Sequence, residues 1–222
     1  DNNGWTALHW AAHSGNFEGI ETILAVYPES ERLQALNRTT RNGETVLHLV
    51  AGSSKVDCIK AVLVLYPESD RLHLVSLADN KGWTVLHCAA RSGNFGAIET
   101  ILTFYPESER LQALNRTTHD GETVLQTALH FVAPSTNIEC IKAVLSLLPE
   151  SQWRQVLDKQ DSHGWTVLDR MNMNTRNSIM KWLSRSENSV LKRSHHSAIE
   201  TTEENDVEQP EAKRQRTYGP LE

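Results

Sequence analysis

The stretch that decides the fold is DNKGWTVLHCAA, residues Asp79–Ala90. Its first four residues favour a tight turn, because Asp, Asn and Gly tolerate left-handed backbone conformations. Thr84 can cap a following helix by accepting a hydrogen bond from an N–H group of the first turn. Val85, Leu86 and the two alanines have the spacing that buries one face of a helix. The stretch therefore predicts a turn followed by a helix that packs against a neighbour.

The same pattern occurs five times along the 222 residues. Each copy carries a turn glycine, and these are Gly4, Gly43, Gly82, Gly121 and Gly164. Their spacings are 39, 39, 39 and 43 residues. A fixed period of this length predicts a stack of supersecondary units, each of which buries its apolar face against the next.

At these residues the chain resembles the ankyrin-repeat family. The family pattern is a D-x-x-G turn followed by T-P-L-H-x-A-A on a first helix. In the first copy it is matched by Asp1, Gly4, Thr6, Leu8, His9, Ala11 and Ala12. The resemblance covers about residues 1–185 and implies an all-α solenoid of five helix–turn–helix repeats with short hairpin turns. Two features depart from the pattern: the motif proline is Ala or Val here, and the repeat is about six residues longer than the common 33.

We expect the array to occupy residues 1–186, with repeats at about 1–39, 40–78, 79–117, 118–160 and 161–186. The last repeat is degenerate, as expected of a C-terminal cap. Residues 187–222 contain no Trp or Phe and are expected to form a disordered tail, because they cannot bury enough apolar surface to offset the entropy of ordering. Since the chain opens inside a repeat turn, further repeats are expected upstream.

Two details distinguish these repeats. The segment ESERLQAL after Pro28 predicts a short third helix with Pro28 at its first position, and an ordered loop is the alternative. Repeat 4 has four extra residues, LQTA, and four residues are close to one helical turn. We therefore expect one longer helix that protrudes from the stack at Gln126–Val132.

The composition limits the classes of partner. The net charge of −6 does not favour a nucleic-acid partner. No stretch is long and apolar enough for a membrane span, and the three cysteines are interpreted as reduced thiols. We expect a monomeric chain that binds another protein and no nucleic acid or membrane.

Histidines and cysteines are the candidates for chemistry. Four histidines, His9, His48, His87 and His130, are assigned to the motif position. The resemblance implies that each bonds back to the capping Thr and to the neighbouring loop. Helices in adjacent repeats lie about 10 Å apart, so these side chains cannot share an ion, and no metal or cofactor is expected.

The adjacent pair His87–Cys88 is the weak candidate for catalysis. Consecutive helix residues point about 100° apart, so the imidazole does not face the thiol. The sequence therefore predicts a protein that is not an enzyme.

The resemblance implies two groups of partner-binding residues. In the family, the residue after the motif histidine faces the concave groove. That position holds Trp10, Leu49, Cys88 and Phe131, with His13 and Arg91 one turn further on. The turn tips are the other usual contact, and here they are represented by Asn3, Asn42, Lys81, Asp120 and His163. The slot after the turn glycine alternates between Trp and Glu, and this row either forms a binding ridge or its tryptophans pack over the adjacent turns. The residues are Trp5, Glu44, Trp83, Glu122 and Trp165.

These features predict a protein–protein interaction module that uses the concave groove and the turn tips. The alternative is the targeting or binding arm of a larger secreted effector or enzyme with its catalytic domain outside this chain. Lys213–Arg216 resembles a nuclear-import tag. The acidic composition of Glu200–Glu211 resembles the Glu-rich signals of type IV-secreted ankyrin effectors of intracellular bacteria. The expected location is the cytoplasm or nucleus, with secretion into a host cell as a further expectation.

Overall fold

The computed structural model describes residues 1–53, 55–133, 138–161 and 163–185. The chain forms two compact units, Asp1–Ile179 and Met180–Glu222. The described residues of the first unit form helices joined by turns and include no strand. In the second unit, residues 180–185 are helical. The tail predicted at 187–222 lies outside the described residues, and every described helix is too short or too polar to cross a lipid bilayer.

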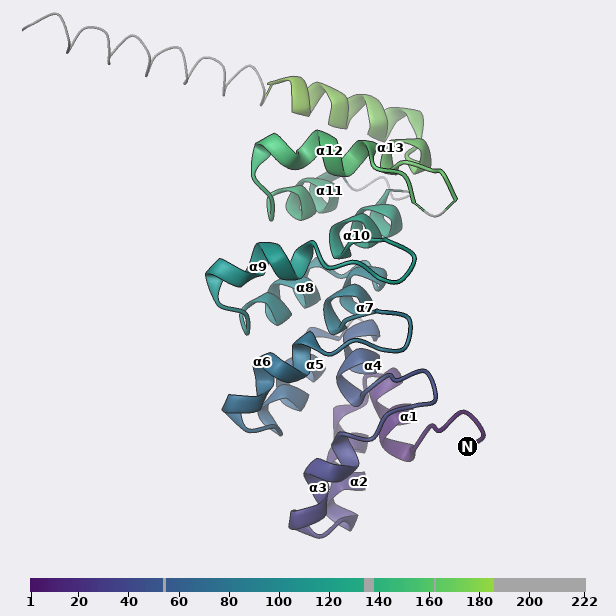
Figure 1. Cartoon of the computed structure of the whole chain (residues 1–222), viewed down its shortest axis with the longest axis vertical. Coiled ribbons are helices and arrows are strands. Elements are labelled where there is room, and N and C mark those ends of the chain that lie inside the picture. The colour runs from purple at the N-terminus through teal and green to yellow at the C-terminus, as the bar shows by residue number, and fades with distance from the viewer. Residues whose placement is uncertain (54, 134–137, 162, 186–222) are drawn as a thin grey trace, which may run out of the picture. The chain divides into compact units, whose positions relative to one another are not determined.

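The first unit is a stack of ankyrin-type repeats, which confirms the predicted fold (Figure 1). The first helices are α1 (Ala7–His13), α4 (Val46–Gly52), α7 (Val85–Arg91), α10 (Val124–Val132) and α13 (Val167–Arg170). The second helices are α2 (Phe17–Val26), α5 (Val56–Val64), α8 (Phe95–Leu102) and α11 (Ile138–Leu145). The third helices are α3 (Glu29–Leu36), α6 (Glu68–Ser76), α9 (Glu107–Leu114) and α12 (Trp153–Asp158), the last preceded by the 3-10 helix η1 (Glu150–Gln152). Residues 173–179 are helical and follow α13.

One capping arrangement starts the first helices of repeats 1 to 3. In α7, His87 Nδ1 accepts a hydrogen bond from the Thr84 backbone N–H at 3.2 Å and lies 2.8 Å from the Thr84 hydroxyl. With Nδ1 acting as an acceptor, Nε2 carries the proton and donates to the carbonyl of Glu122 in the next repeat at 3.3 Å. His9 and His48 form the same bonds, reaching the carbonyls of Arg38 and Trp83. These histidines are therefore structural, as the resemblance implied.

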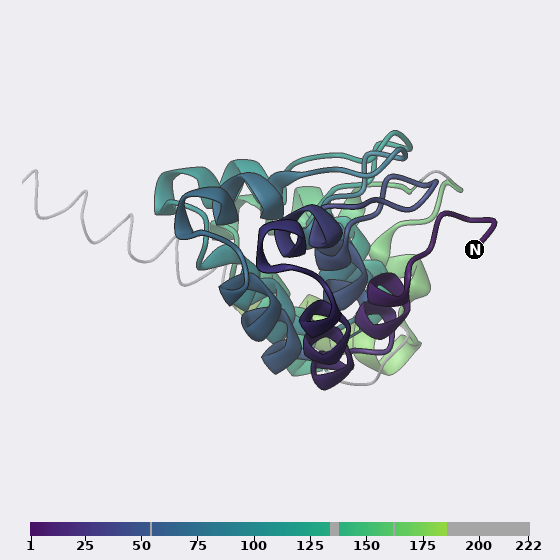
Figure 2. The same ribbon diagram turned by 90° about the horizontal axis from the view of Figure 1, so that it is seen from below.

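The hairpin turns are joined to one another by backbone hydrogen bonds. The N–H groups of Arg41, Asn80 and His119 each donate to a carbonyl of the preceding turn at 2.8–2.9 Å. Gly82 adopts a φ of +80°, and a Cβ atom there would lie 3.0 Å from the backbone nitrogen of His119. Glycine is thus required both by the turn and by the close approach of the next repeat. Figure 2, viewed along the stack, shows the hairpins projecting together on one side.

The core lies between the first and second helices. Equivalent leucines of the first helices, Leu8, Leu47, Leu86 and Leu125, are at most 1% exposed. Tyr66 and Tyr105 connect successive third helices, since their hydroxyls donate to the carbonyls of Leu36 and Val75. Burial of each leucine contributes roughly 1.5–3 kcal/mol, so stability comes mainly from this repeated layer.

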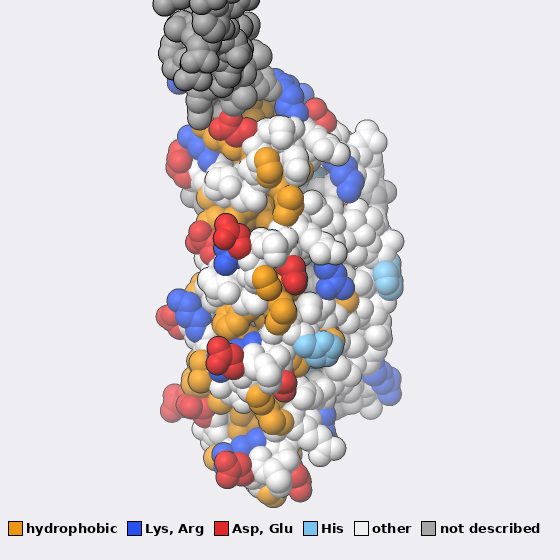
Figure 3. Space-filling view, turned by 60° about the vertical axis from the view of Figure 1, so that its left-hand side comes forward, with side chains coloured by type: hydrophobic (Ala, Val, Ile, Leu, Met, Phe, Trp, Pro, Cys, Tyr) orange, Lys and Arg blue, Asp and Glu red, His pale blue; other side chains and the backbone are white. Residues whose placement is uncertain are grey.

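The third helix exists, and the alternative of an ordered loop is wrong. Its start differs from the prediction by one residue, because Pro28 is the N-cap with an extended ψ of 144° and the helix begins at Glu29. The extended Pro28 turns the chain away from α2 before the new helix starts. Figure 3 shows hydrophobic side chains gathered in a column over the third helices, beside acidic side chains.

The prediction for the insertion in repeat 4 was partly wrong. A single helix does run through Gln126–Val132, and α10 has nine residues where α4 has seven. Over residues 126–130 it does not protrude, because these side chains are buried, while the side chains of residues 131 and 132 lie outside the described part of the chain. The hairpin and the capping Thr123 fix the first residue of α10, so the extra residues are accommodated toward its C-terminal end and beyond.

This register changes two assignments. The capping partner of Thr123 is Gln126, whose Oε1 accepts the Thr123 backbone N–H at 3.1 Å. Gln126 therefore occupies the motif position assigned to His130, and His130 lies one turn later. Thr127, rather than Phe131, is the counterpart of Trp10; the side chain of Phe131 lies outside the described residues.

Candidate functional site

The groove face is defined here by two positions on the first helices, one and four residues after the capping side chain. The first position holds Trp10, Leu49, Cys88 and Thr127, and the second holds His13, Gly52, Arg91 and His130. Of the predicted groove residues, Trp10 is 55% exposed, and His13 and Arg91 are also exposed. Leu49 and Cys88 are buried, so their side chains offer a partner little surface.

An aromatic cluster covers the groove face of repeat 1. The rings of Trp5 and Trp10 lie 4.6 Å apart between centroids with an interplanar angle of 44°. The imidazole of His13 meets the Trp5 ring edge-on at 5.4 Å. Trp5 is half-buried and supports Trp10 from the hairpin side. The cluster therefore holds a large exposed ring in a fixed orientation.

A cavity of about 290 Å³ lies on the same face, between the hairpins of repeats 2 to 4. Its lining is Asn42, Glu44, Asp79, Lys81, Trp83, Cys88, Arg91 and Asp120. Five of the predicted site residues are brought together here, namely Asn42, Lys81, Cys88, Arg91 and Asp120. Asn3 and His163 are exposed at the turn tips of repeats 1 and 5 and do not line it.

Asp79 was missed as a site residue in the sequence, and Glu44 was considered only as a member of the row that follows the turn glycines. The signal was present, because Glu follows the turn glycine in the even repeats and Asp opens the next turn in the odd ones. Asp79 Oδ1 accepts the backbone N–H groups of Lys81 and Trp83, both at 2.8 Å, which fixes the carboxylate at the cavity wall. The Arg91 guanidinium lies 5.4 Å above the Trp83 ring. The cavity therefore combines three carboxylates, two cations and an aromatic face, which suits binding of a polar side chain.

The cavity does not support Cys88 as a nucleophile. Burial raises the pKa of the Cys88 thiol to about 12, so the reactive thiolate is scarce at neutral pH. Both ring nitrogens of His87 are engaged, with Thr84 and with the Glu122 carbonyl. His87 is thus not available as a base for the neighbouring thiol.

Of the three tryptophans that follow turn glycines, two pack against neighbours. Trp5 and Trp83 are half-buried, and each contacts a residue of its own first helix. Trp165 differs, with 55% of its surface exposed. The three side chains therefore do not form one uniform ridge.

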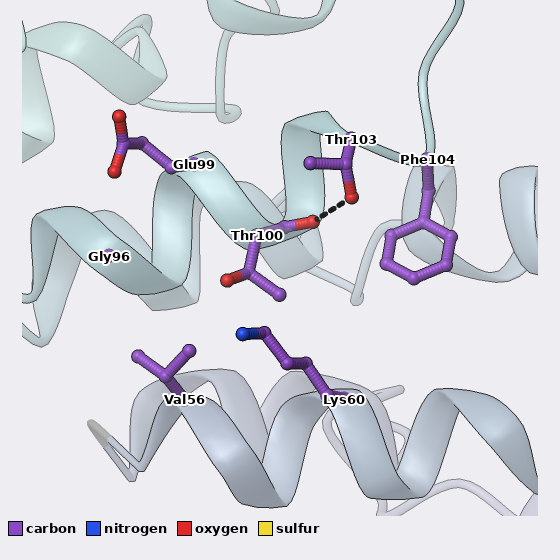
Figure 4. A pocket seen from close by; sticks show the side chains of 7 residues that line it. All are labelled: Val56, Lys60, Gly96, Glu99, Thr100, Thr103 and Phe104. Atoms are coloured by element: carbon purple, nitrogen blue, oxygen red, sulfur yellow. Dashed lines mark hydrogen bonds between the residues drawn. The ribbon is translucent and has the colours of Figure 1, made fainter.

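A second cavity, of about 540 Å³, lies between α5 and α8. Figure 4 shows Lys60 of α5 directed toward Thr100 of α8, with Phe104 at one end. The Thr103 hydroxyl donates to the Thr100 carbonyl at 2.7 Å. None of the predicted site residues lines this cavity.

Comparison with known families agrees with the geometry. A model described as ankyrin repeats in three copies matches residues 29–113, and a model of the single ankyrin repeat matches residues 3–31. Together they span residues 3–113, half of the 222-residue chain. Comparison with curated proteins gives no match. The chain therefore belongs to the ankyrin-repeat family, whose members generally act as protein–protein interaction modules.

Proposed function

We propose that this chain binds a partner protein along the groove face and turn tips of repeats 1 to 4. Trp10 is the aromatic anchor of the contact, and the cavity around Lys81 and Arg91 receives a polar side chain of the partner. The observation that carries the proposal is the 55% exposure of Trp10, held in place by Trp5 at 4.6 Å. Exposed aromatic side chains in fixed orientations are typical binding anchors.

The exposed part of Trp10 sets the scale of its contribution. A Trp side chain buries about 150–250 Å² when it is fully covered, so covering the remaining half removes roughly 80–140 Å² from water. At about 25 cal/mol per Å², this burial is worth about 2–3 kcal/mol. Truncation to alanine should therefore weaken binding roughly 30- to 160-fold.

The cavity supplies selectivity. Glu44, Asp79 and Asp120 favour a cationic or hydrogen-bond-donating group, while Lys81 and Arg91 at the same wall disfavour a bare positive patch. A partner side chain that can contact both the carboxylates and the cations of the cavity therefore fits better than one that carries a single charge. This contact should make the association rate fall as salt increases.

The test is affinity capture from eukaryotic cell lysate with three baits: the unmodified chain, Trp10→Ala and Trp165→Ala. Trp165 is a matched control, because it is the same residue type with the same 55% exposure but lies in repeat 5. We expect one captured protein to be retained by Trp165→Ala and lost by a folded Trp10→Ala variant. Equal capture by all three baits would refute the anchor role of Trp10.

A direct binding measurement follows with the captured protein. Lys81→Ala and Arg91→Ala should weaken the complex and reduce its salt dependence, because both charges line the cavity. Val26→Ala is the control for this step, since Val26 is 83% exposed on α2 and lies outside the cavity lining. A loss of affinity in Val26→Ala as large as in Trp10→Ala would place the contact on the second helices.

A further inference from the structure

A cluster of three ligand-type side chains lies where repeats 4 and 5 meet. The hairpin of repeat 4 supplies Glu122, α10 supplies His130, and the turn of repeat 5 supplies Asp161. One potential ligand atom from each residue lies within 4.8 Å of the other two. His130 and Asp161 are buried, and Glu122 is half-buried.

The imidazole of His130 has no hydrogen-bond partner within the described part of the chain. Its side chain is 7% exposed, and its Nε2 atom is buried and unpaired. Its Nδ1 atom faces Asp161 Oδ2 at 3.7 Å, longer than a hydrogen bond. Buried polar atoms are nearly always satisfied, so a buried imidazole with neither nitrogen hydrogen-bonded, and with Nδ1 on the side of the carboxylates, points to a missing partner at Nδ1.

The repeats themselves provide a comparison. Glu44 and Asp79 are the counterparts of Glu122 and Asp161, one repeat pair earlier. The position equivalent to His130 in that pair is Gly52, which has no side chain to offer. Of repeats 2 and 4, repeat 4 is therefore the one that adds a third ligand where the two carboxylates converge.

We propose that Glu122, His130 and Asp161 bind a divalent transition-metal ion, for which Zn²⁺ is the best-fitting candidate. Zn²⁺ accepts imidazole nitrogen and carboxylate oxygen at about 2.1 Å in tetrahedral geometry, which places ligand atoms about 3.4 Å apart. The 3.7 Å between His130 Nδ1 and Asp161 Oδ2 is close to this value. Glu122 has the longest and least buried side chain of the three, so it can close the remaining gap. Water would complete the coordination.

Arg170 is the competitor for the ion. Its guanidinium contacts Asp161 Oδ2, the oxygen that faces His130. The Arg170 side chain is 38% exposed and lines an open cavity with His163, Trp165 and Asp169. Rotation of Arg170 into that cavity frees the oxygen and opens a path for the ion. Asp161 Oδ1 keeps the backbone N–H groups of His163 and Trp165 at 2.8 and 2.9 Å, which holds the carboxylate in position.

The test measures Zn²⁺ affinity of the full, untagged chain by competition with a chromophoric chelator after EDTA treatment. We expect one Zn²⁺ to bind, and His130→Ala to weaken binding by about tenfold or more, at least as much as losing an outer-shell group. Glu122→Gln should also weaken it, and this variant preserves the size of a half-buried side chain, so its result stands apart from any folding defect of His130→Ala. Arg170→Gln should tighten binding, which a merely structural role of the cluster would not produce.

The tail histidines His195 and His196 need their own control. The double variant His195→Ala/His196→Ala should bind Zn²⁺ as the unmodified chain does. Co²⁺ bound to the unmodified chain should give the intense visible absorption of a tetrahedral site, and Glu122→Gln should abolish it. Absence of Zn²⁺ binding, unchanged binding in Glu122→Gln, or loss of binding in the tail variant would each overturn the proposal.

Discussion

Two substitutions of His87 should separate the two roles of a motif histidine, which are to cap its own helix and to form a hydrogen bond with the next repeat. His87→Ala removes the contacts of Nδ1 with the Thr84 N–H and hydroxyl, and the bond from Nε2 to the Glu122 carbonyl. His87→Gln should keep the first two, because Gln126 already forms them with Thr123 in repeat 4. It should lose only the bond between repeats.

The magnitudes follow from the number of bonds lost. Each buried hydrogen bond contributes about 0.5–1.5 kcal/mol, so the free energy of unfolding should fall by about 1 kcal/mol in His87→Gln and about 3 kcal/mol in His87→Ala. With a urea dependence of about 2 kcal/mol per M, the midpoints should shift by about 0.5 and 1.5 M. Circular dichroism in urea gives both values.

His73→Ala is the matched control, because His73 is exposed near the end of α6. It should change the free energy of unfolding by less than about 0.5 kcal/mol. Equal destabilisation by His87→Gln and His87→Ala would refute the division into cap and inter-repeat bond. A wild-type midpoint in His87→Ala would refute the structural role of the histidine altogether.

Three further predictions concern single residues. Gly82→Ala should lower the free energy of unfolding by more than Gly121→Ala does. Both glycines have a φ near +80°, so alanine at either site carries a left-handed strain of about 1–2 kcal/mol. At Gly82 the new Cβ atom would also lie 3.0 Å from a backbone nitrogen, and thermal denaturation of the two variants should show the difference. The Cys88 thiol, with a pKa of about 12, should react with iodoacetamide at pH 8 only after the chain unfolds, and mass spectrometry of the modified peptide would show this. Rapid labelling of the folded chain would contradict the burial of Cys88. Burial lowers the pKa of His87 from 6.5 to about 4, so between these pH values the unfolded chain binds a proton that the folded chain excludes. The free energy of unfolding should therefore be highest above about pH 6.5 and should fall by up to about 3 kcal/mol as the pH drops toward 4. Urea titrations across that range should show a flatter pH dependence for His87→Gln.

The sequence by itself determined the repeat and its helices. The second helix of repeat 1 spans Phe17–Val26, and its apolar face and the Tyr27–Pro28 boundary are local signals in the sequence. The capping role of His9, His48 and His87, which the resemblance implied, likewise involves residues only three apart in sequence. Turn glycines and caps act within a few residues, so their effects can be read without knowing the neighbours.

Only the tertiary structure decided which residues meet across repeats. The insertion in repeat 4 could be aligned at either end of its first helix, and the hairpin and the Thr123 cap, which fix the start of that helix, place the extra residues after it. This moved His130 out of the motif position and beside Asp161. Leu49 and Cys88 occupy predicted groove positions, yet packing between α4 and α7 buries them while Trp10 remains exposed. Side-chain exposure and the meeting of Glu122, His130 and Asp161 depend on residues one repeat away, and for that reason no local pattern contains them.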